Sequence, residues 1–454
     1  MAGWGAAAFW LPGGLRAAGQ SEKLSTLTDG KLTVGADLNR GGAITLLKHA
    51  EDGRNLVNNH DCGRQIQQSY YSGPRPFDPN GTMHPAWNNW CWNPIQVGDV
   101  YGNRAEVVEH RNDGREIYTR TIPLHWALNN VPGECTFETW IRLQGGVVKV
   151  RCRLNNHRSD KTQYHAHGQE LPALYTVGTL HRLFTYTGTR PFTGDSLERI
   201  ENNGPPWTGW LGTENWAALV DEDDWGVGLH HAGALKYTGG FHGEPGVGGS
   251  SDRHTGYFAP LHLEILDHNI TYGYEFTLIP GTLQEIRDWV YEHRPEPRPN
   301  YVFRSDRQHW RYRNAGDAGM PVEGHLTVRP GPGDPQMIGP RCAFRAEQVS
   351  KLYVRTRYRL SDPDSGQLQG RLYWQNATDD RAEPGRWSND RSVAFTVRNG
   401  ELRTYELDMS ESPGWHGLIT GLRFDPVPSG KGDDRVDVMG IGHDPGLLEK
   451  GAGT

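Results

Sequence analysis

The residues best suited to acid–base chemistry lie in residues 161–176, KTQYHAHGQELPALYT. On an extended strand, His165, His167 and Gln169 share one face, and Glu170 points to the other unless the preceding glycine introduces a bulge. Histidine exchanges protons near neutral pH, and a glutamate in an aromatic pocket can have its pKa raised into the range of an acid catalyst. The segment predicts proton transfer. A two-histidine metal site and a pair of structural histidines are the alternatives.

A second polar segment, NNHDCGRQIQQSYYSGP, spans residues 58–74. A strand over residues 64–71 would have no apolar face, which favours a strand lining a polar groove over a solvated edge strand. Asp61 supplies a carboxylate for catalysis. The candidates for binding a substrate here are Asn59, His60, Arg64, Gln67 and Tyr71.

Tryptophans and amides alternate in HPAWNNWCWNPIQVGDVYGN, residues 84–103. Indole rings match the C–H face of a sugar, and amides match its hydroxyl groups. The segment therefore predicts carbohydrate binding by Trp90, Trp92 and Gln96, with the two indoles on one face of a strand. A tryptophan-rich core beneath a loop is the alternative.

Two later segments add candidates. Glu214 begins an apolar strand beside Trp216, and we assign it as a catalytic carboxylate with Trp216 and Gln169 among the substrate contacts. The glycine-rich stretch 239–256 predicts a long flexible loop lining a cleft, since such loops are commonly functional. His254 and Tyr257 flank this loop and could close over a substrate.

Composition bounds the class of protein. The 454 residues carry 47 basic and 54 acidic side chains, a net charge of −7, which gives no footprint for nucleic acid. Fifty-eight glycines and 29 prolines favour many short strands over helices. No run of 18 apolar residues is present, so we expect no membrane span. The five cysteines form no CxxC pair, and buried free thiols compete with a Cys62–Cys91 or Cys135–Cys152 bridge.

The spacing of strand-like runs predicts an all-β chain. Residues 24–292 form the first domain, which closes with a helix over 281–292. A proline-rich linker follows at 293–300, then a β-sandwich at 301–445 and a tail at 446–454. Residues 1–23 are either a remnant of an export signal or a disordered start, and the first alternative predicts a secreted or periplasmic protein.

The first domain resembles the galactose-mutarotase-like β-supersandwich shared by aldose epimerases, several polysaccharide lyases and accessory domains of glycoside hydrolases. The resemblance rests on GGAITLL followed by GRNLVNNHDCGRQIQ. It implies an arginine, two histidines and a carboxylate base around a sugar ring. The matching residue types here are Arg64, His165 or His167, and Glu170 or Glu214.

The second domain is similar to the jelly-roll carbohydrate-binding modules of bacterial glycan-degrading enzymes, on the segment Trp415–Gly442. Sandwich core is the alternative role for its tryptophans Trp374, Trp387 and Trp415.

Together these features predict an enzyme that degrades a polysaccharide or oligosaccharide, and we favour a glycoside hydrolase with Glu170 as general acid and Asp61 or Glu214 as partner. A polysaccharide lyase based on His165 or Tyr71 is the second interpretation, followed by a non-catalytic glycan-binding protein and a sugar epimerase. No nucleotide, zincin or esterase motif is present, so we expect no required cofactor, although calcium could support a loop.

Overall fold

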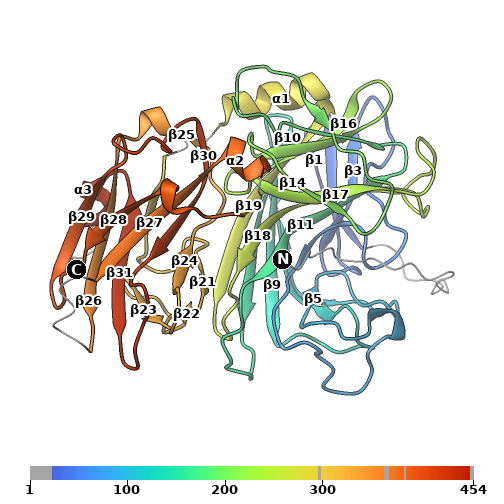
Figure 1. Cartoon of the computed structure of the whole chain (residues 1–454). Coiled ribbons are helices and arrows are strands. Elements are labelled where there is room, and N and C mark those ends of the chain that lie inside the picture. The colour runs from blue at the N-terminus through green and yellow to red at the C-terminus, as the bar shows by residue number, and fades with distance from the viewer. Residues whose placement is uncertain (1–22, 295–297, 362–367, 383–384, 450–454) are drawn as a thin grey trace. The chain divides into compact units, whose positions relative to one another are not determined.

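The computed structural model describes residues 23–294, 298–361, 368–382 and 385–449. The chain divides into two compact units. Unit 1 runs to His262 and includes Leu266–Arg294, and unit 2 comprises Leu263–Ile265 and the chain from Pro295 onward. Both units consist mainly of antiparallel strands, as the all-β prediction requires (Figure 1). The predicted start at 1–22, part of the linker (295–297) and the end of the tail (450–454) lie outside the described residues.

Unit 1 contains two large sheets. The first sheet has the order β1-β2-β3-β4-β11-β18-β17-β14, with β5 and β8 attached to β4. Its strands are β1 (Leu24–Thr28), β2 (Leu32–Asp37), β3 (Ala43–His49), β4 (Ile66–Ser69), β5 (Pro94–Ile95), β8 (Leu124–His125), β11 (His167–Val177), β14 (Thr208–Leu211), β17 (Lys236–His242) and β18 (Thr255–Glu264).

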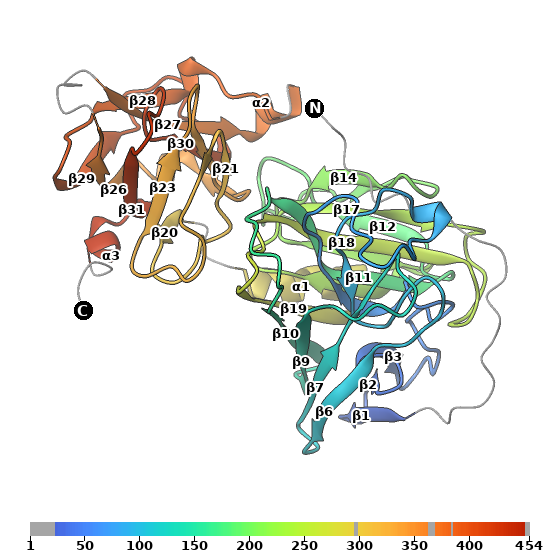
Figure 2. The ribbon, with the colours of Figure 1, turned by 90° about the horizontal axis from the view of Figure 1, so that it is seen from below.

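The second sheet has the order β13-β12-β15-β16-β19-β10-β9-β7-β6, and Figure 2 shows β6, β7, β9 and β10 side by side at one end. Its strands are β6 (Glu106–Asn112), β7 (Glu116–Ile122), β9 (Cys135–Gln144), β10 (Val147–Asn156), β12 (Arg182–Thr185), β13 (Glu198–Arg199), β15 (Trp216–Val220), β16 (Trp225–His230) and β19 (Thr271–Thr282).

The two sheets pack face to face. Tyr70, which follows β4, contacts Phe137 of the second sheet at a ring-centroid distance of 5.0 Å. Gln68 of β4 donates a hydrogen bond to the Thr139 hydroxyl at 2.8 Å. β4 is therefore a central strand with neighbours on both sides, and the edge-strand interpretation of residues 64–71 is wrong.

The predicted helix is α1 (Leu283–Glu292), which packs on the second sheet. Thr282 caps it by accepting from the Glu285 backbone N–H, while the Glu285 carboxylate accepts from the Thr282 backbone, so both ends of this capping box are satisfied. Ile286 and Val290 are fully buried against Trp216 and its neighbours. Helix periodicity in the sequence thus located this element to within two residues.

Unit 2 is a β-sandwich of two six-stranded sheets around one core, in which Trp374 and Trp415 are buried as the core alternative predicts. One sheet holds β20 (Asn300–Val302), β22 (Ala315–Gly316), β23 (Leu326–Pro330), β26 (Lys351–Arg359), β29 (Leu402–Asp408) and β31 (Arg435–Gly442). The other holds β21 (Arg311–Arg313), β24 (Gln336–Ile338), β25 (Phe344–Arg345), β27 (Gln369–Asn376), β28 (Ser392–Thr396) and β30 (Leu418–Asp425).

The remaining elements are short helices, which in unit 2 include the 3-10 helices η2 (Ala346–Gln348) and η3 (Asn389–Arg391). The helices α2 (Ala377–Ala382) and α3 (Pro445–Glu449) belong to unit 2, and the latter occupies the start of the predicted tail. The 3-10 helix η1 (Pro85–Trp87) lies in unit 1. Among the described residues, no helix combines the length and apolar character needed to cross a lipid bilayer.

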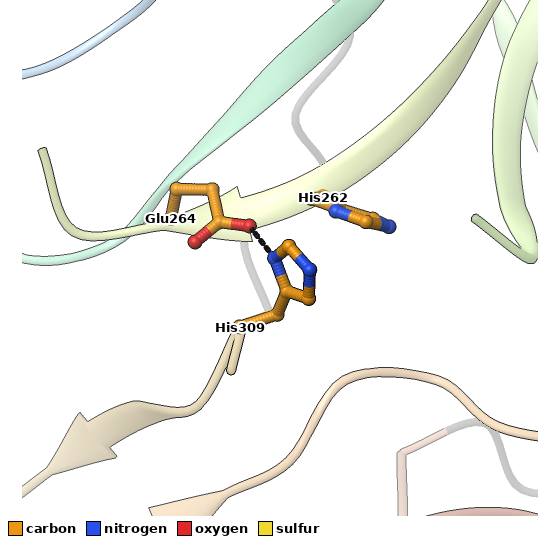
Figure 3. Close-up of side chains that lie close together, drawn as sticks. All are labelled: His262, Glu264 and His309. Atoms are coloured by element: carbon orange, nitrogen blue, oxygen red, sulfur yellow. Dashed lines mark hydrogen bonds and ion pairs between the residues drawn. The ribbon is translucent and has the colours of Figure 1, made fainter. Parts of the chain in front are cut away.

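The end of β18 is grouped with unit 2 rather than unit 1. There the ring nitrogen Nδ1 of His309 lies 2.5 Å from the Glu264 carboxylate (Figure 3). His262 is two residues before Glu264 on the same strand.

The five cysteines are all free thiols, so neither of the two proposed bridges forms.

Candidate active site

Glu170 lies on β11, in the middle of the first sheet. It pairs with Ser69 of β4, whereas Ala173 pairs with Gln67, and the register shifts between these two pairs. Because paired residues of antiparallel strands share a face, this bulge turns Glu170 and Ala173 to the same side despite their odd spacing. The sequence predicted a bulge at Gly168, whereas the register shifts after it, between Glu170 and Ala173.

Three tyrosines surround the Glu170 carboxyl group. Burial raises its pKa from 4.5, and the hydroxyls of Tyr257 and Tyr71 oppose that rise. Burial and the charge of Glu170 in turn hold the pKa values of Tyr71, Tyr175 and Tyr257 well above the ordinary value. The Tyr257 hydroxyl is buried near Glu170 and makes no hydrogen bond of normal geometry. Burial thus makes Glu170 a weaker acid than an exposed glutamate.

An aromatic wall stands beside Glu170, formed by Tyr175, Tyr257 and Trp207. The ring centroids of Tyr175 and Tyr257 are 4.5 Å apart, and those of Tyr257 and Trp207 are 5.0 Å apart. Ala173 and Ala259 pack with these rings. Tyr175 is the half-buried member of the three, so its ring offers surface to a ligand.

Asp61 supplies a second carboxylate to this site. Its side chain is 40% exposed and lies 3.2 Å from the Arg64 guanidinium. The charges of Glu170 and Asp61 both raise the pKa of Tyr175, and that of Arg64 lowers it. Coulomb interaction falls with distance, so both carboxylates lie within electrostatic reach of one hydroxyl group. The structure therefore brings together Asp61, Arg64, Tyr71, Glu170 and Tyr257 of the predicted set.

Arg64 fastens a loop to the site instead of facing a substrate. Its side chain is 2% exposed, and Nη1 donates to the Arg253 carbonyl at 2.6 Å. Burial lowers the pKa of Arg64 to about 10. Arg253 belongs to the connection 243–254 between β17 and β18, which is a long hairpin. The prediction that Arg64 binds sugar is wrong for this conformation because the hairpin covers its guanidinium.

Further bonds hold the same hairpin against residues 58–60. The Asn59 backbone N–H donates to the Ser250 carbonyl at 2.5 Å, and the His60 ring contacts the Ser251 carbonyl at 3.0 Å. The Asn58 amide donates to the His254 carbonyl at 2.9 Å. The His254 ring itself accepts from the Glu244 backbone at 2.8 Å and so closes the hairpin from within. Asn58, Asn59 and His60 therefore anchor the hairpin, which is not an unattached flexible loop.

Three glutamines predicted to bind sugar form hydrogen bonds with backbone groups of the protein instead. Gln67 accepts from the Val97 N–H and donates to the Cys62 carbonyl. Gln96 donates to the Gly41 carbonyl at 2.9 Å. Gln169 both accepts from and donates to the backbone of Tyr71, at 2.7 and 2.8 Å, and so fixes that tyrosine. All three are buried, which contradicts the prediction of direct substrate contact.

Of the tryptophans predicted to bind sugar, some are buried and one lies beside the site. The segment around residues 85–92 is a 3-10 turn and loop rather than a strand, so Trp90 and Trp92 do not share a face. Trp92 and Trp216 are each 1% exposed and cannot stack on a sugar. Trp90 is half-buried and meets Tyr71 edge-on at 6.4 Å. Only Trp90 of the predicted tryptophans therefore adjoins the site.

Glu214 is a structural carboxylate, so its assignment to catalysis is wrong. It is fully buried and accepts hydrogen bonds from the Phe192 backbone at 2.8 Å, the Tyr291 hydroxyl at 2.8 Å and the Trp216 indole at 3.1 Å. Arg287 adds an ion pair at 3.5 Å. Both oxygen atoms thus accept hydrogen bonds from the protein, and their complete burial keeps them from a substrate.

The histidines of the first segment lie outside this group. β11 begins at His167, so His165 precedes the strand and is exposed. Burial lowers the pKa of His167, whose Nδ1 contacts the His165 carbonyl at 2.8 Å. In the described part of the chain, neither histidine belongs to a group of three potential metal ligands.

Tyr175 and Trp207 are not among the residues predicted from the sequence. Tyr175 lies five residues after Glu170 in the same segment. Only the register shift between Glu170 and Ala173 turns both residues to the same face, and the sequence does not show where that shift lies. Trp207 precedes a short edge strand, β14, and nothing in its local sequence links it to β18. Pairing of β14 with β17, and of β17 with β18, brings it to Tyr257.

Comparisons with known proteins find similar structures only. No protein-family model matches the chain, and no curated protein matches it. The solved structures found include a galactose mutarotase-like protein from Lactobacillus casei ATCC 334 (13% identity, 56% of this chain, 99% of that chain, TM-score 0.33). They also include a galactose mutarotase related enzyme from Lactobacillus acidophilus (11%, 57%, 97%, TM-score 0.35) and a 4-alpha-glucanotransferase from Thermococcus litoralis (12%, 57%, 39%, TM-score 0.30).

The first two bear the family name that the sequence resemblance suggested. Similarity of this size supports no statement about activity, so the chemistry has to be argued from the side chains.

Proposed function

We propose that unit 1 is a carbohydrate-active enzyme, a glycoside hydrolase in which Glu170 is the general acid and Asp61 the second carboxylate. The observation that carries this proposal is the hydrogen-bonded link between the segments that hold the two carboxyl groups. The Tyr175 backbone N–H on β11 donates to the Gln65 carbonyl at 3.1 Å, and the Gln65 amide donates to the Asp61 carbonyl at 2.7 Å. The charges of Glu170 and Asp61 both raise the pKa of Tyr175, in agreement with this arrangement. Hydrolysis of a glycosidic bond needs two carboxyl groups on either side of that bond. The half-buried Tyr175 ring beside them offers a face on which a sugar ring can stack.

The two carboxyl groups have the different environments that their roles require. Glu170 is 8% exposed, and burial raises its pKa, so it can carry a proton to the glycosidic oxygen. Asp61 is partly exposed and lies 3.2 Å from the Arg64 guanidinium. In the proposed reaction Glu170 donates its proton to the leaving oxygen as the glycosidic bond breaks. In one route Asp61 removes a proton from the water molecule that attacks the sugar carbon. In the other route Asp61 attacks that carbon itself, and water, giving a proton back to Glu170, then cleaves the bond between the sugar and Asp61.

The lyase interpretation has weaker support. It requires groups that neutralise a uronate carboxylate, a role predicted for Arg64 and Asn59. The Arg64 guanidinium donates to the Arg253 carbonyl of the hairpin 243–254, and the Asn59 side chain donates to the Thr45 carbonyl at 2.8 Å. His165, one of its two candidate bases, is exposed and precedes β11.

A panel of neutral and uronate-containing polysaccharides tests the proposal. New reducing ends without the ultraviolet absorbance of an unsaturated uronate are the expected result. A rise of both signals would replace the hydrolase by a lyase with Tyr71 as base. Binding of a glycan with no cleavage of any polysaccharide would make unit 1 a binding protein.

A further inference from the structure

Three tryptophans form a second aromatic group near the candidate active site. The rings of Trp87 and Trp90 are 4.7 Å apart, and those of Trp87 and Trp126 are 5.5 Å apart, both in edge-to-face geometry. Trp87 is 8% exposed, whereas Trp90 and Trp126 are half-buried. Two of the three indoles therefore offer surface, supported from behind by the third. We refer to Trp87, Trp90 and Trp126 as the indole group.

At one end of the indole group, Trp90 contacts Tyr71, a neighbour of Glu170. Trp90 meets Tyr71 at a centroid distance of 6.4 Å and an interplanar angle of 76°. The Tyr71 hydroxyl is one of the two that influence the pKa of Glu170. Gln169 fixes the Tyr71 backbone, so this end of the group has a defined position.

The other end reaches Asp61. The Trp126 ring lies over Gly63, where an added methyl group would come within 2.8 Å of Cη2 of the indole and 3.4 Å of the Asp61 carboxylate. Only a residue without a side chain lets the indole approach so closely. The aromatic wall of Tyr175, Tyr257 and Trp207 adjoins the same two carboxyl groups through Tyr175. The indole group therefore extends from Tyr71, whose hydroxyl influences Glu170, to the neighbourhood of Asp61.

Polar groups around Trp90 suit a sugar. The Trp90 indole N–H donates to Asn93 at 3.1 Å, and the Arg75 guanidinium lies 5.9 Å from the ring centroid. The side chains of Asn88 and Asn89 are exposed next to it. Fixed rings with exposed amides at their rim match the C–H faces and hydroxyl groups of a pyranose.

We propose that the indole group is a second sugar subsite, so that the substrate is a glycan with a sugar unit on each side of the cleaved bond. One sugar stacks on Tyr175, the half-buried ring of the aromatic wall, and the next stacks on Trp90 and Trp126. This inference rests on the proposed function, because the cleaved bond has to lie between Glu170 and Asp61. It excludes free monosaccharides and glycosides with a small non-sugar leaving group as preferred substrates.

Binding to the Glu170→Gln variant tests the inference without turnover. The probes are cellotetraose, laminaritetraose, mannotetraose and xylotetraose, each compared with its monosaccharide by calorimetry. At least one tetrasaccharide is expected to bind more tightly than its monosaccharide, and adding Trp90→Ala should weaken its binding by about tenfold, the loss of one stacked ring. Monosaccharide binding should not change. Trp126→Ala is a second variant in case Trp90→Ala fails to fold.

Trp140→Ala is the matched control. Trp140 is a half-buried indole on β9 of the second sheet, with the Arg151 guanidinium 4.1 Å from its ring, and its loss should leave tetrasaccharide binding unchanged. Equal binding of tetrasaccharide and monosaccharide, with cleavage in the polysaccharide panel, would overturn the second subsite and leave the hydrolase standing. Neither binding nor cleavage of any glycan would overturn both.

Discussion

Glu170 and Glu214 are two buried glutamates in aromatic surroundings of unit 1, the first on β11 and the second in the turn before β15, and they differ in the groups bonded to them. Four groups hold the Glu214 carboxylate: the Phe192 backbone, Tyr291, Trp216 and Arg287. Glu170 has tyrosine hydroxyls beside it and no cation bonded to it, and burial raises its pKa.

The comparison shows that burial and aromatic neighbours do not distinguish a reactive carboxyl group from a structural one. A buried carboxylate that already accepts hydrogen bonds from several protein donors is held in place by them. A carboxyl group whose pKa is raised by burial is better suited to give a proton away near neutral pH. The two glutamates have similar aromatic neighbours in the sequence, and only their hydrogen-bond partners in the structure show which one is structural.

The largest expected effect is on activity. Glu170→Gln should lower kcat/KM on the cleaved polysaccharide by about 10²- to 10⁴-fold, because the amide cannot donate an acidic proton to the leaving oxygen. Glycan binding should persist, since the two side chains have the same shape. Reducing-end assays measure the loss. Unchanged activity in a folded variant would remove Glu170 from the mechanism.

Glu214→Gln should instead lower the free energy of unfolding by about 3 kcal/mol, because the neutral amide leaves Arg287 buried without its charged partner. Urea unfolding measures this loss, and activity per folded molecule should stay near that of the wild type. Glu275→Gln, at an exposed position of β19, is the control. A stable Glu214→Gln variant without activity would reverse the two assignments.

Stability should depend on pH through Glu170. Its folded-state pKa is above 4.5, so its contribution is fully present below about pH 4.5 and is lost as pH rises through the folded value. Glu170→Gln does not titrate, and its melting temperature relative to the wild type should rise between about pH 4 and about pH 8. The change amounts to about 1.4 kcal/mol for each pKa unit of the shift.

The exposed residue Glu244 provides the control for this pH series, as Glu244→Gln should show a constant difference from the wild type. A difference for Glu170→Gln that also stays constant would mean that burial does not raise the pKa of Glu170.

The smallest effect concerns two tyrosine hydroxyls. Tyr291→Phe should cost about 1 kcal/mol, because its hydroxyl donates to Glu214 at 2.8 Å and accepts from Arg287 at 2.9 Å. Tyr257→Phe should change stability by less than about 0.5 kcal/mol, since its hydroxyl makes no hydrogen bond of normal geometry, but it should shift the pH profile of activity. Equal losses of stability in the two variants would contradict the distinction between the two glutamates.

Local patterns in the sequence predicted most of the fold. Alternation of apolar and polar residues located strands such as β9 and β10, and helical periodicity located α1. The glycines of residues 239–256 predict a flexible loop. In the structure residues 243–254 form a hairpin, to which Arg64 and Asn59 donate hydrogen bonds from a distant segment. Contacts between residues almost 200 positions apart leave no local pattern.

The candidate site was predictable in part. Asp61, Tyr71, Glu170 and Tyr257 were selected because their types stand out in polar segments, and the first sheet brings them together. Gln67, Gln96 and Trp92 have the same residue types as sugar-binding side chains, yet they are buried and Gln67 and Gln96 bond to the backbone. Residue type shows what a side chain can bind, whereas sheet order and register decide what it meets.

The most direct test of the central claim follows the oxygen of the cleaving water. Polysaccharide is incubated with the wild type in water enriched in oxygen-18, and the first products are weighed by mass spectrometry. Hydrolysis with Glu170 as general acid predicts one heavy oxygen per cleaved bond, and no such product from Glu170→Gln in the same time. Products that lack the heavy oxygen and carry an unsaturated sugar would contradict it, as would unchanged labelling by the Glu170→Gln variant.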